Sequence, residues 1–283
     1  MNPSYILTLS CADRPGLVAR VAGDLLKLQA NILEAQQFND LEFGRFFMRI
    51  AFETGSDPAA LEAAVAGLCT ELAMDGRLRA VADRMRVLIL TSRFDHCLGD
   101  LLYRSRVGEL NMEVVGIVSN HPAERLAVQD FGKIPFHYLP VTPETKVTQE
   151  AQIKALVAES GAELVVLARY MQILSDGLAA HLEGRCINIH HSFLPSFKGA
   201  RPYHQAHARG VKIIGATAHY VTADLDEGPI IAQDVEHITH ADTPETLVRK
   251  GRDIEQRVLA RAVRHHLDQR VLLNGATTVV FRD

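Results

Sequence analysis

An apolar run between Glu163 and Ala168 is the feature that most constrains the fold: after Glu163 the chain reads Leu-Val-Val-Leu-Ala. A strand without alternating polar residues is buried on both faces, which is typical of the middle of a parallel sheet. Met85 to Leu90 is a second, largely apolar strand. Parallel neighbours are joined by crossover connections, usually helices. We therefore predict an α/β fold in which helices cover the sheet.

Helical and strand patterns alternate around these two strands. Apolar residues at helical spacing predict helices, and short apolar stretches between them predict strands. The predicted helices cover Cys97–Ser105, Ala123–Phe131, Lys146–Ser160 and Thr243 to about Leu267, and the further strands cover Asn111–Ser119, Ile134–Leu139, Cys186–His190 and Lys212–Val221. This alternation predicts a Rossmann-like domain with a mostly parallel sheet from residue 84 to residue 283.

Residues 1 to 83 have a different order of elements. Strand, helix, strand, strand, helix and strand follow one another, which predicts a ferredoxin-like domain. The helices run from Asp13-Arg14-Pro15-Gly16 to about Leu28 and from Pro58 to about Met74, and the two middle strands form a hairpin across Asn39-Asp40. Asp13 is the expected cap of the first helix, and Pro15 fits its first turn because the missing N–H costs nothing there.

Two polar side chains stand at the end of the strand that begins at Cys186. Alternation with a period of two puts Asn188 and His190 on the same face, and an irregular loop with Pro195, Lys198 and Gly199 follows. Strand ends in open α/β sheets bind ligands. A second polar loop, Thr222 to Pro229, follows the strand that ends at Val221. Taken alone, Asn188 and His190 are also typical of strand-end hydrogen bonding, and the second loop is typical of a simple turn.

Together these motifs resemble the folate-dependent formyltransferase family. The matching segments are Asn188-Ile189-His190, Leu194 to Gly199, Gly215 to His219 and Asp226-Glu227-Gly228-Pro229. The resemblance implies Asn188, His190 and Asp226 as the catalytic set. It implies a pteridine pocket between two loops, with Arg169, Tyr170, Met171, Gln172, Ile173 and Leu174 on one wall and Thr222, Ala223 and Asp224 on the other. Thr217 and His219 would support the site, and Lys198 would stand at its entrance.

The first strand–helix junction of this domain lacks the glycines of a dinucleotide site. No glycine occurs between Thr91 and Cys97, so backbone cannot approach a pyrophosphate, and we exclude NAD and ATP. Glycinamide-ribonucleotide formyltransferases have a glycine-rich junction here that holds the phosphate of their substrate. The run Ser92 to Leu98, with the bulky side chains of Arg93 to His96, instead resembles the formyltetrahydrofolate deformylases.

The N-terminal domain resembles an ACT domain, which the same deformylases carry. Such domains commonly pair with copies of themselves and often bind small effectors, usually amino acids. The resemblance implies an effector site at Asp13, Arg14, Pro15 and Gly16, where a helix N-terminus offers free N–H groups to a carboxylate. The alternative, that Asp13 and Gly16 only cap and turn the chain, stays open. We expect a homo-oligomer.

Charge and cysteine usage exclude several other classes of protein. The 283 residues carry a net charge of −4, which gives no reason to expect a nucleic acid or an acidic membrane surface as partner. No apolar run is long enough to span a bilayer. Four scattered cysteines, Cys11, Cys69, Cys97 and Cys186, suit the reducing cytoplasm and argue against a zinc site. We expect neither a metal nor a separate cofactor.

The activity that the resemblance implies is hydrolysis of 10-formyltetrahydrofolate to formate and tetrahydrofolate. It would supply formate for purine synthesis and balance the one-carbon folate pool, with water as the acceptor of the formyl group. Such a reaction needs an oxyanion donor and a proton for the leaving nitrogen, which Asn188, His190 and Asp226 would provide. The sequence leaves two alternatives open. The chain could transfer the formyl group to an amine such as glycinamide ribonucleotide, or it could be a folate- or amino-acid-sensing protein without activity.

Overall fold

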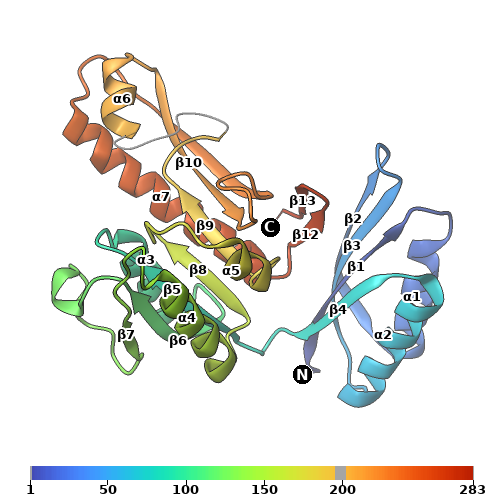
Figure 1. The fold of residues 1–283 in the computed structure, drawn as a ribbon. Coiled ribbons are helices and arrows are strands. Elements are labelled where there is room, and N and C mark those ends of the chain that lie inside the picture. Colours follow the sequence, from blue (N-terminus) through green and yellow to red (C-terminus); the bar gives the residue numbers. More distant parts are fainter. Residues whose placement is uncertain (1, 195–201, 283) are drawn as a thin grey trace. The chain divides into compact units, whose positions relative to one another are not determined.

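The apolar run at residues 164–168 is a central strand of a seven-stranded sheet. The computed structural model describes residues 2–194 and 202–282, and the sheet has the order β11-β10-β9-β8-β5-β6-β7 (Figure 1). β8 (Leu164–Ala168) is buried at every residue and pairs in parallel with β5 (Met85–Thr91) and β9 (Cys186–His190). The predicted position of this strand is confirmed.

The sheet is mostly parallel, with an antiparallel edge. β6 (Met112–Ser119) and β7 (Phe136–Tyr138) extend the parallel part beyond β5. On the other side, β10 (Ile213–Tyr220) runs antiparallel to β9, and β11 (Ile230–His237) runs antiparallel to β10. The reversal at β10 matters for the site, because the loop after β10 begins beside the start of β9.

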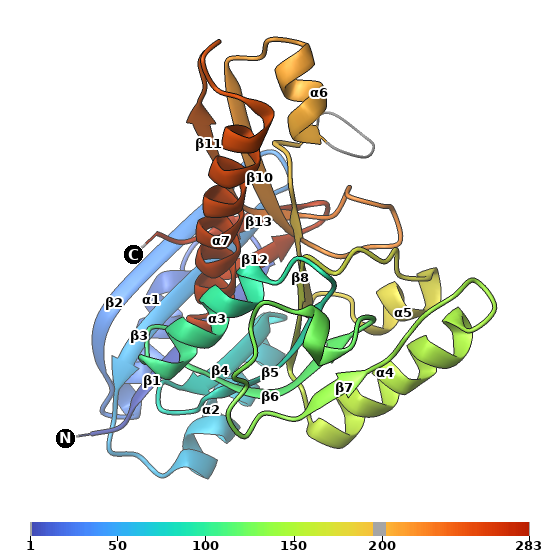
Figure 2. The same ribbon diagram turned by 90° about the vertical axis from the view of Figure 1, so that its left-hand side faces the viewer.

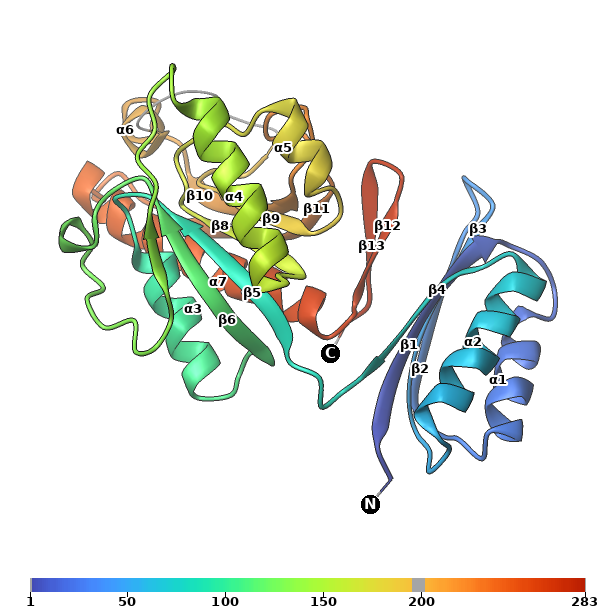
Figure 3. The same cartoon turned by 60° about the horizontal axis from the view of Figure 1, so that its bottom comes forward.

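Helices cover both faces of this sheet, as expected for a parallel core. α3 (His96–Arg106) and α7 (Pro244–Leu267) pack against each other on one face, and α4 (Lys146–Ser160) and α5 (Asp176–His181) lie on the other (Figures 2 and 3). Leu88 and Leu90 of β5 join one apolar cluster with Ile153 and Val157 of α4. The sequence did not predict α5 or the short α6 (Pro202–Ala208).

The helix predicted over Ala123–Phe131 is wrong. Only one short 3-10 turn, η1 (Ala123–Arg125), forms there, and the chain then becomes irregular. Side chains take over the backbone groups that a helix would use. The buried carboxylate of Asp95 accepts from the Val128 N–H at 2.7 Å, and the Gln129 amide donates to the carbonyl oxygens of Ala123 and Leu126. Such side-chain bonds compete with helix formation.

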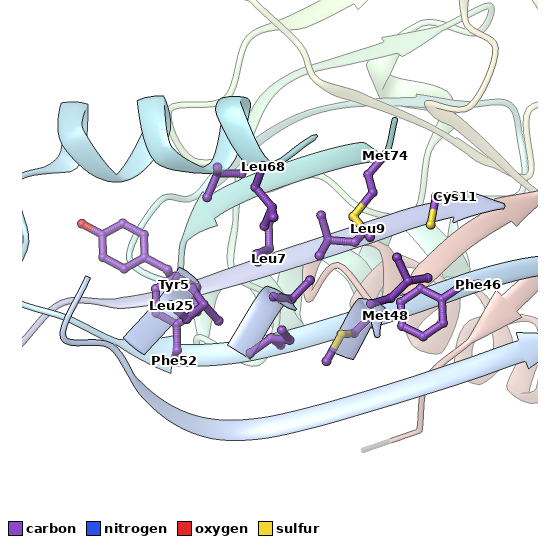
Figure 4. Packing of buried hydrophobic residues seen from close by; sticks show 14 of the residues in the cluster. Tyr5, Leu7, Leu9, Cys11, Leu25, Phe46, Met48, Phe52, Leu68 and Met74 are labelled. Atoms are coloured by element: carbon purple, nitrogen blue, oxygen red, sulfur yellow. The ribbon is translucent and has the colours of Figure 1, made fainter. Parts of the chain in front are cut away.

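The N-terminal unit is an antiparallel sheet with two helices, in the predicted order. Its strands are β1 (Ser4–Ala12), β2 (Asn31–Asp40), β3 (Arg45–Glu53) and β4 (Asp75–Ala80), arranged β2-β3-β1-β4, and its helices are α1 (Leu17–Lys27) and α2 (Pro58–Leu72). Leu7 of β1 points toward Leu68 of α2 in the core of this unit, and Leu9 lies beside Met74 (Figure 4). The fold class predicted from the sequence is confirmed.

Two details of this unit differ from the predictions. α1 begins at Leu17, and its N-cap is Gly16 at φ 90°, with no side chain bonded to the helix end, so Asp13 does not cap it. Only glycine adopts this backbone conformation without strain. The β2–β3 hairpin turns through residues 41–44 instead of Asn39-Asp40, because the Asp40 carboxylate accepts from the N–H groups of Glu42 and Phe43.

The chain forms two compact units that are not continuous in sequence. Met1–Arg84, Asp268–Asn274 and Val279–Asp283 form the first, and Met85–Leu267 with Gly275–Thr278 form the second. The final strands β12 (Val271–Asn274) and β13 (Thr277–Val280) pair as a hairpin, most of which clusters with the first unit. The division of roles between residues 1–83 and 84–283 remains a proposal.

Across the described residues, no helix combines the length and apolarity needed to span a membrane.

A matched pair of substitutions tests the importance of the buried sheet. Val87 on β5 has no exposed surface, whereas Val147 on α4 is 81% exposed. We expect Val87→Ala to lower the free energy of unfolding by about 2–3 kcal/mol, since two buried carbons and their contacts are lost. Val147→Ala should change it by less than about 0.5 kcal/mol. Urea unfolding followed by circular dichroism measures both, and equal losses would contradict the central role of β5.

Candidate active site

Asn188 and His190 project from β9 into a cavity of about 700 Å³. The neighbouring Ile187 and Ile189 are buried at 0% and 3% exposure, and the two polar residues are partly exposed, as the alternating pattern predicted. Because β10 is antiparallel, His219 lies directly opposite Asn188, and Thr217 lies opposite His190. The pairing of these two strands therefore brings four polar residues together.

Asp226 joins this group from the loop after β10. Its carboxylate lies 3.2 Å from Nδ1 of His190 and 3.8 Å from Nε2 of His219. Burial by itself would raise the pKa of Asp226, but the His190 imidazole binds its charged form and holds the pKa well below its ordinary value. Asp226 is therefore an ionised carboxylate at neutral pH, and it orients the His190 ring.

His219 fixes the orientation of the Asn188 amide. Its Nδ1 donates to the Tyr220 carbonyl at 2.8 Å, which leaves Nε2 to accept from the Asn188 Nδ2 at 3.2 Å. Gly228 packs against this arrangement so closely that a Cβ there would lie 1.8 Å from the Tyr220 carbonyl oxygen. With one amide hydrogen bound to His219, the second can point into the cavity.

Two residues at the cavity have left-handed backbone conformations. Asp226 has φ 60° and Arg169 has φ 63°, and both line the cavity. Aspartate tolerates this region better than most residues, whereas an arginine there is unusual. Strained positions of this kind persist where the surrounding structure requires them and cluster at functional sites.

The two loops expected to enclose a ligand do line the cavity. Arg169 to Leu174 and Thr222 to Asp224 contribute to its walls, together with Asn188, His190, His219 and Asp226. The first loop is held by Ser92, whose hydroxyl accepts from the Met171 N–H at 3.0 Å and donates to Asn120 at 2.6 Å. Met171 and Ile173 are 51% and 61% exposed, so this wall offers open apolar surface.

Thr217 supports the loop that follows β9. Its hydroxyl donates to the Ser192 carbonyl at 3.0 Å and accepts from the Leu194 N–H and the Gln233 amide. Thr217 lies outside the cavity wall and acts on the site by holding the backbone of this loop. Lys198, expected at the entrance, lies outside the described residues.

Sequence reasoning missed a buried polar cluster on another side of the cavity. We call it the Glu255 cluster: Glu255, His96, Tyr203 and Arg169. Tyr203 donates its hydroxyl to Glu255 Oε1 at 2.6 Å, and His96 Nε2 and Arg169 Nε lie 2.7 and 3.3 Å from Oε2. Burial alone would raise the pKa of Glu255, but the bond with His96 and the Arg169 charge hold it below its ordinary value. All four residues line the cavity.

A signal for this cluster was present in the sequence. Leu247, Gly251, Glu255 and Leu259 follow at four-residue spacing on α7, and all four are buried. A carboxylate on such a stripe needs buried partners. Gly251 provides the space, since a Cβ there would lie 2.1 Å from the Tyr203 ring. The sequence could not identify His96, Tyr203 and Arg169 as the partners, because they come from three other segments.

The Glu255 cluster also contains a potential set of metal donors. The donor atoms of His96, Cys97 and Glu255 lie within 4.8 Å of one another. However, His96 and Glu255 bond directly, and the Arg169 guanidinium adds a fixed positive charge beside the carboxylate. Burial also raises the pKa of the Cys97 thiol well above its ordinary value, which disfavours the thiolate that a metal needs. We assign no metal to this cluster.

His191 links the two groups of polar residues. Its ring stacks on that of His190, with centroids 5.1 Å apart. Burial, followed by the nearby charge of Arg169, lowers the pKa of His191 to about 4. His191 is therefore neutral at physiological pH, and it places an uncharged ring between the Glu255 cluster and His190.

Comparison with known proteins finds relatives along nearly the whole chain. The Formyl transferase family profile matches residues 85–263, and the ACT domain profile matches residues 5–66. A formyltetrahydrofolate deformylase from Corynebacterium sp. (strain P-1) is 50% identical over 281 residues, which are 98% of each chain. The crystal structure of formyltetrahydrofolate deformylase from Burkholderia mallei ATCC 23344 is 49% identical, covers 99% of this chain and 100% of its own, and has a TM-score of 0.93.

A more distant likeness covers part of the chain. The crystal structure of glycinamide ribonucleotide transformylase 1 from Symbiobacterium toebii is 28% identical, with a TM-score of 0.64 over 70% of this chain and 95% of its own. The similarity to the deformylases therefore extends over both units, and the similarity to this transformylase over less of the chain.

The low pKa of His191 predicts acid sensitivity. An unfolded histidine takes up a proton near pH 6.5, whereas folded His191 does so near 4. The unfolded state therefore binds more protons between these values, and stability falls as the pH drops through this window. From pH 7 to pH 5 the contribution of His191 is a loss of about 2 kcal/mol.

His191→Gln removes this titration while keeping a polar side chain. Urea unfolding of the native chain and the variant at pH 7 and pH 5 gives the comparison. We expect the variant to lose about 2 kcal/mol less than the native chain between the two pH values. Identical losses would show that His191 does not resist protonation in the folded state.

Proposed function

Because the chain belongs to the formyltetrahydrofolate deformylase family, we propose that it hydrolyses 10-formyltetrahydrofolate to formate and tetrahydrofolate. The observation that carries this proposal is the convergence of Asn188, His190 and Asp226 at one cavity, with Asp226 bonded to His190. The reaction would supply formate for purine synthesis and balance the one-carbon folate pool. The folate is the substrate, water is the second reactant, and we propose no separate cofactor.

The chemistry follows from the resistance of a formamide to attack. The nitrogen donates electrons into the carbonyl group, so a catalyst must stabilise the negative oxygen that forms and protonate the leaving nitrogen. Asn188 supplies the amide hydrogen that is not bound to His219 to this oxygen. His190 keeps Nδ1 toward Asp226, and its Nε2 is buried with no partner among the described residues. Nε2 is thus the nitrogen that exchanges a proton with the reacting groups.

The folate ring would lie between the two loops of the cavity. Met171, Ile173 and Leu174 would provide an apolar wall, and the loop from Thr222 to Asp224 would face it. Ligand sites are mostly apolar, with a few polar groups that set orientation. Ser92 holds the first loop in place through Met171, and His219 holds Asn188, so both sides of the site are pre-formed.

The N-terminal unit would regulate this reaction. We propose that an amino-acid effector binds at Asp13 to Gly16, where α1 begins without a side-chain cap, and that the unit pairs with copies of itself. The ACT domain match at residues 5–66 supports both.

We also propose a cytoplasmic location, supported by four cysteines that are all unpaired. No nucleic acid or membrane partner is proposed.

One assay tests water as the acceptor. The purified chain is incubated with 10-formyltetrahydrofolate and no amine, and formate and tetrahydrofolate are measured together. We expect equal amounts of both. Release only after glycinamide ribonucleotide is added would identify a transferase instead. Absence of release under both conditions, with amino acids also added as activators, would indicate a binding protein.

Three substitutions test the catalytic assignment. We expect Asn188→Ala to lower kcat by about 10²- to 10³-fold, since one oxyanion donor is lost. His190→Ala and Asp226→Asn should each lose most turnover. Asparagine is the better replacement at residue 226 because it tolerates the left-handed backbone found there.

Matched controls separate catalysis from folding in these variants. Circular dichroism and folate binding should stay close to those of the native chain, because the three side chains are not part of the apolar core. Near-normal kcat in Asp226→Asn would overturn the role given to the carboxylate.

A further inference from the structure

The carboxylate of the Glu255 cluster lies in one wall of the cavity and is held there by its neighbours. Both oxygens of Glu255 have partners: Tyr203 on Oε1, and His96 and Arg169 on Oε2. Glu255 itself is 1% exposed. A free carboxylate beside a reacting carbonyl would attract an amine and hold it for attack. Here the carboxylate is instead paired with Tyr203, His96 and Arg169.

Positive charge dominates the same wall. The Arg169 side chain is 10% exposed, and its Nη1 is buried with no hydrogen-bond partner among the described residues. The guanidinium carbons of Arg169 and Arg252 lie 5.9 and 6.0 Å from the centre of the Phe94 ring. On this wall two cations therefore accompany one carboxylate, and the neighbouring His191 is neutral at physiological pH. At this wall a protonated amine would meet like charge, and both oxygens of Glu255 already have partners.

We propose that Arg169, by neutralising Glu255 and adding a buried positive charge, determines that water and not an amine receives the formyl group. The inference rests on the proposed hydrolysis and identifies what makes the reaction specific for water. Arg169 acts through Glu255 and through its charge, so it is a specificity-determining residue that stays outside the bond-making steps. Discrimination of this kind depends on repulsion as well as attraction.

The two competing reactions differ only in the attacking atom. In hydrolysis the water oxygen bonds to the formyl carbon, the bond from that carbon to the folate nitrogen breaks, and the nitrogen takes one proton, leaving formic acid that ionises to formate. In transfer an amine nitrogen makes the new bond, and one of its protons replaces the formyl group on the folate nitrogen. Both release tetrahydrofolate, so the ratio of N-formyl amine to formate reports the choice of acceptor.

The test compares two substitutions at the same left-handed position. Arg169→Asn removes the charge and releases Glu255 with a residue that tolerates φ 63°, and Arg169→Lys keeps the charge. Each full-length protein is given 10-formyltetrahydrofolate and glycinamide, and N-formylglycinamide and formate are measured by mass spectrometry. We expect the ratio to rise by about tenfold or more in Arg169→Asn, because a like-charge barrier is removed, and to stay near the native value in Arg169→Lys.

The outcomes decide between this inference and the proposed function. An unchanged ratio in an Arg169→Asn variant that still releases formate overturns the inference and leaves hydrolysis intact. Efficient transfer by the native chain overturns both. If Arg169→Asn is inactive, Arg252→Gln, which removes the second cation from an exposed position on α7, gives the answer: a raised ratio supports the role of charge, and an unchanged ratio overturns it.

Discussion

The contact between Asp226 and His190 is the interaction on which the rest of the site depends. Asp226 reaches His190 because β10 runs antiparallel to β9 and its following loop folds back across the strand pair. The same carboxylate lies near His219, which holds the Asn188 amide. The ionised carboxylate is stable here because the attraction of the His190 imidazole outweighs the cost of burial. Removing it would free the His190 ring.

The polar groups of the cavity are arranged in two networks with different purposes. Asn188 and His190 leave an amide hydrogen and a ring nitrogen available to a ligand, whereas the Glu255 cluster pairs its carboxylate internally. Buried polar groups are costly unless they are paired, so the second network needs the fixed partners that it has. His191, stacked on His190 and neutral at physiological pH, lies at the junction. The chemistry and the choice of acceptor can therefore be altered separately.

The C-terminal residues show how a segment distant in sequence completes the first unit. Arg49 on β3 is almost fully buried, and its guanidinium donates to Glu34 at 2.7 Å and to the Asp268 carbonyl at 3.1 Å. Arg270 also reaches Glu34, at 3.3 Å. A buried arginine requires such partners. Residues 268–274 therefore belong to the first unit, although the sequence pattern placed them in the second domain.

The sequence by itself determined the strands, most helices and the pairing of Asn188 with His190, because local periodicity and apolar runs carry that information. The family motifs added Asp226 and the two loops of the cavity. Only the tertiary structure decided what depends on groups from separate segments. Asp95 prevented the helix expected at Ala123–Phe131 by binding the Val128 N–H. Glu255 met its three partners from three other segments, because a side chain's neighbours across a cavity depend on packing, which no local pattern records.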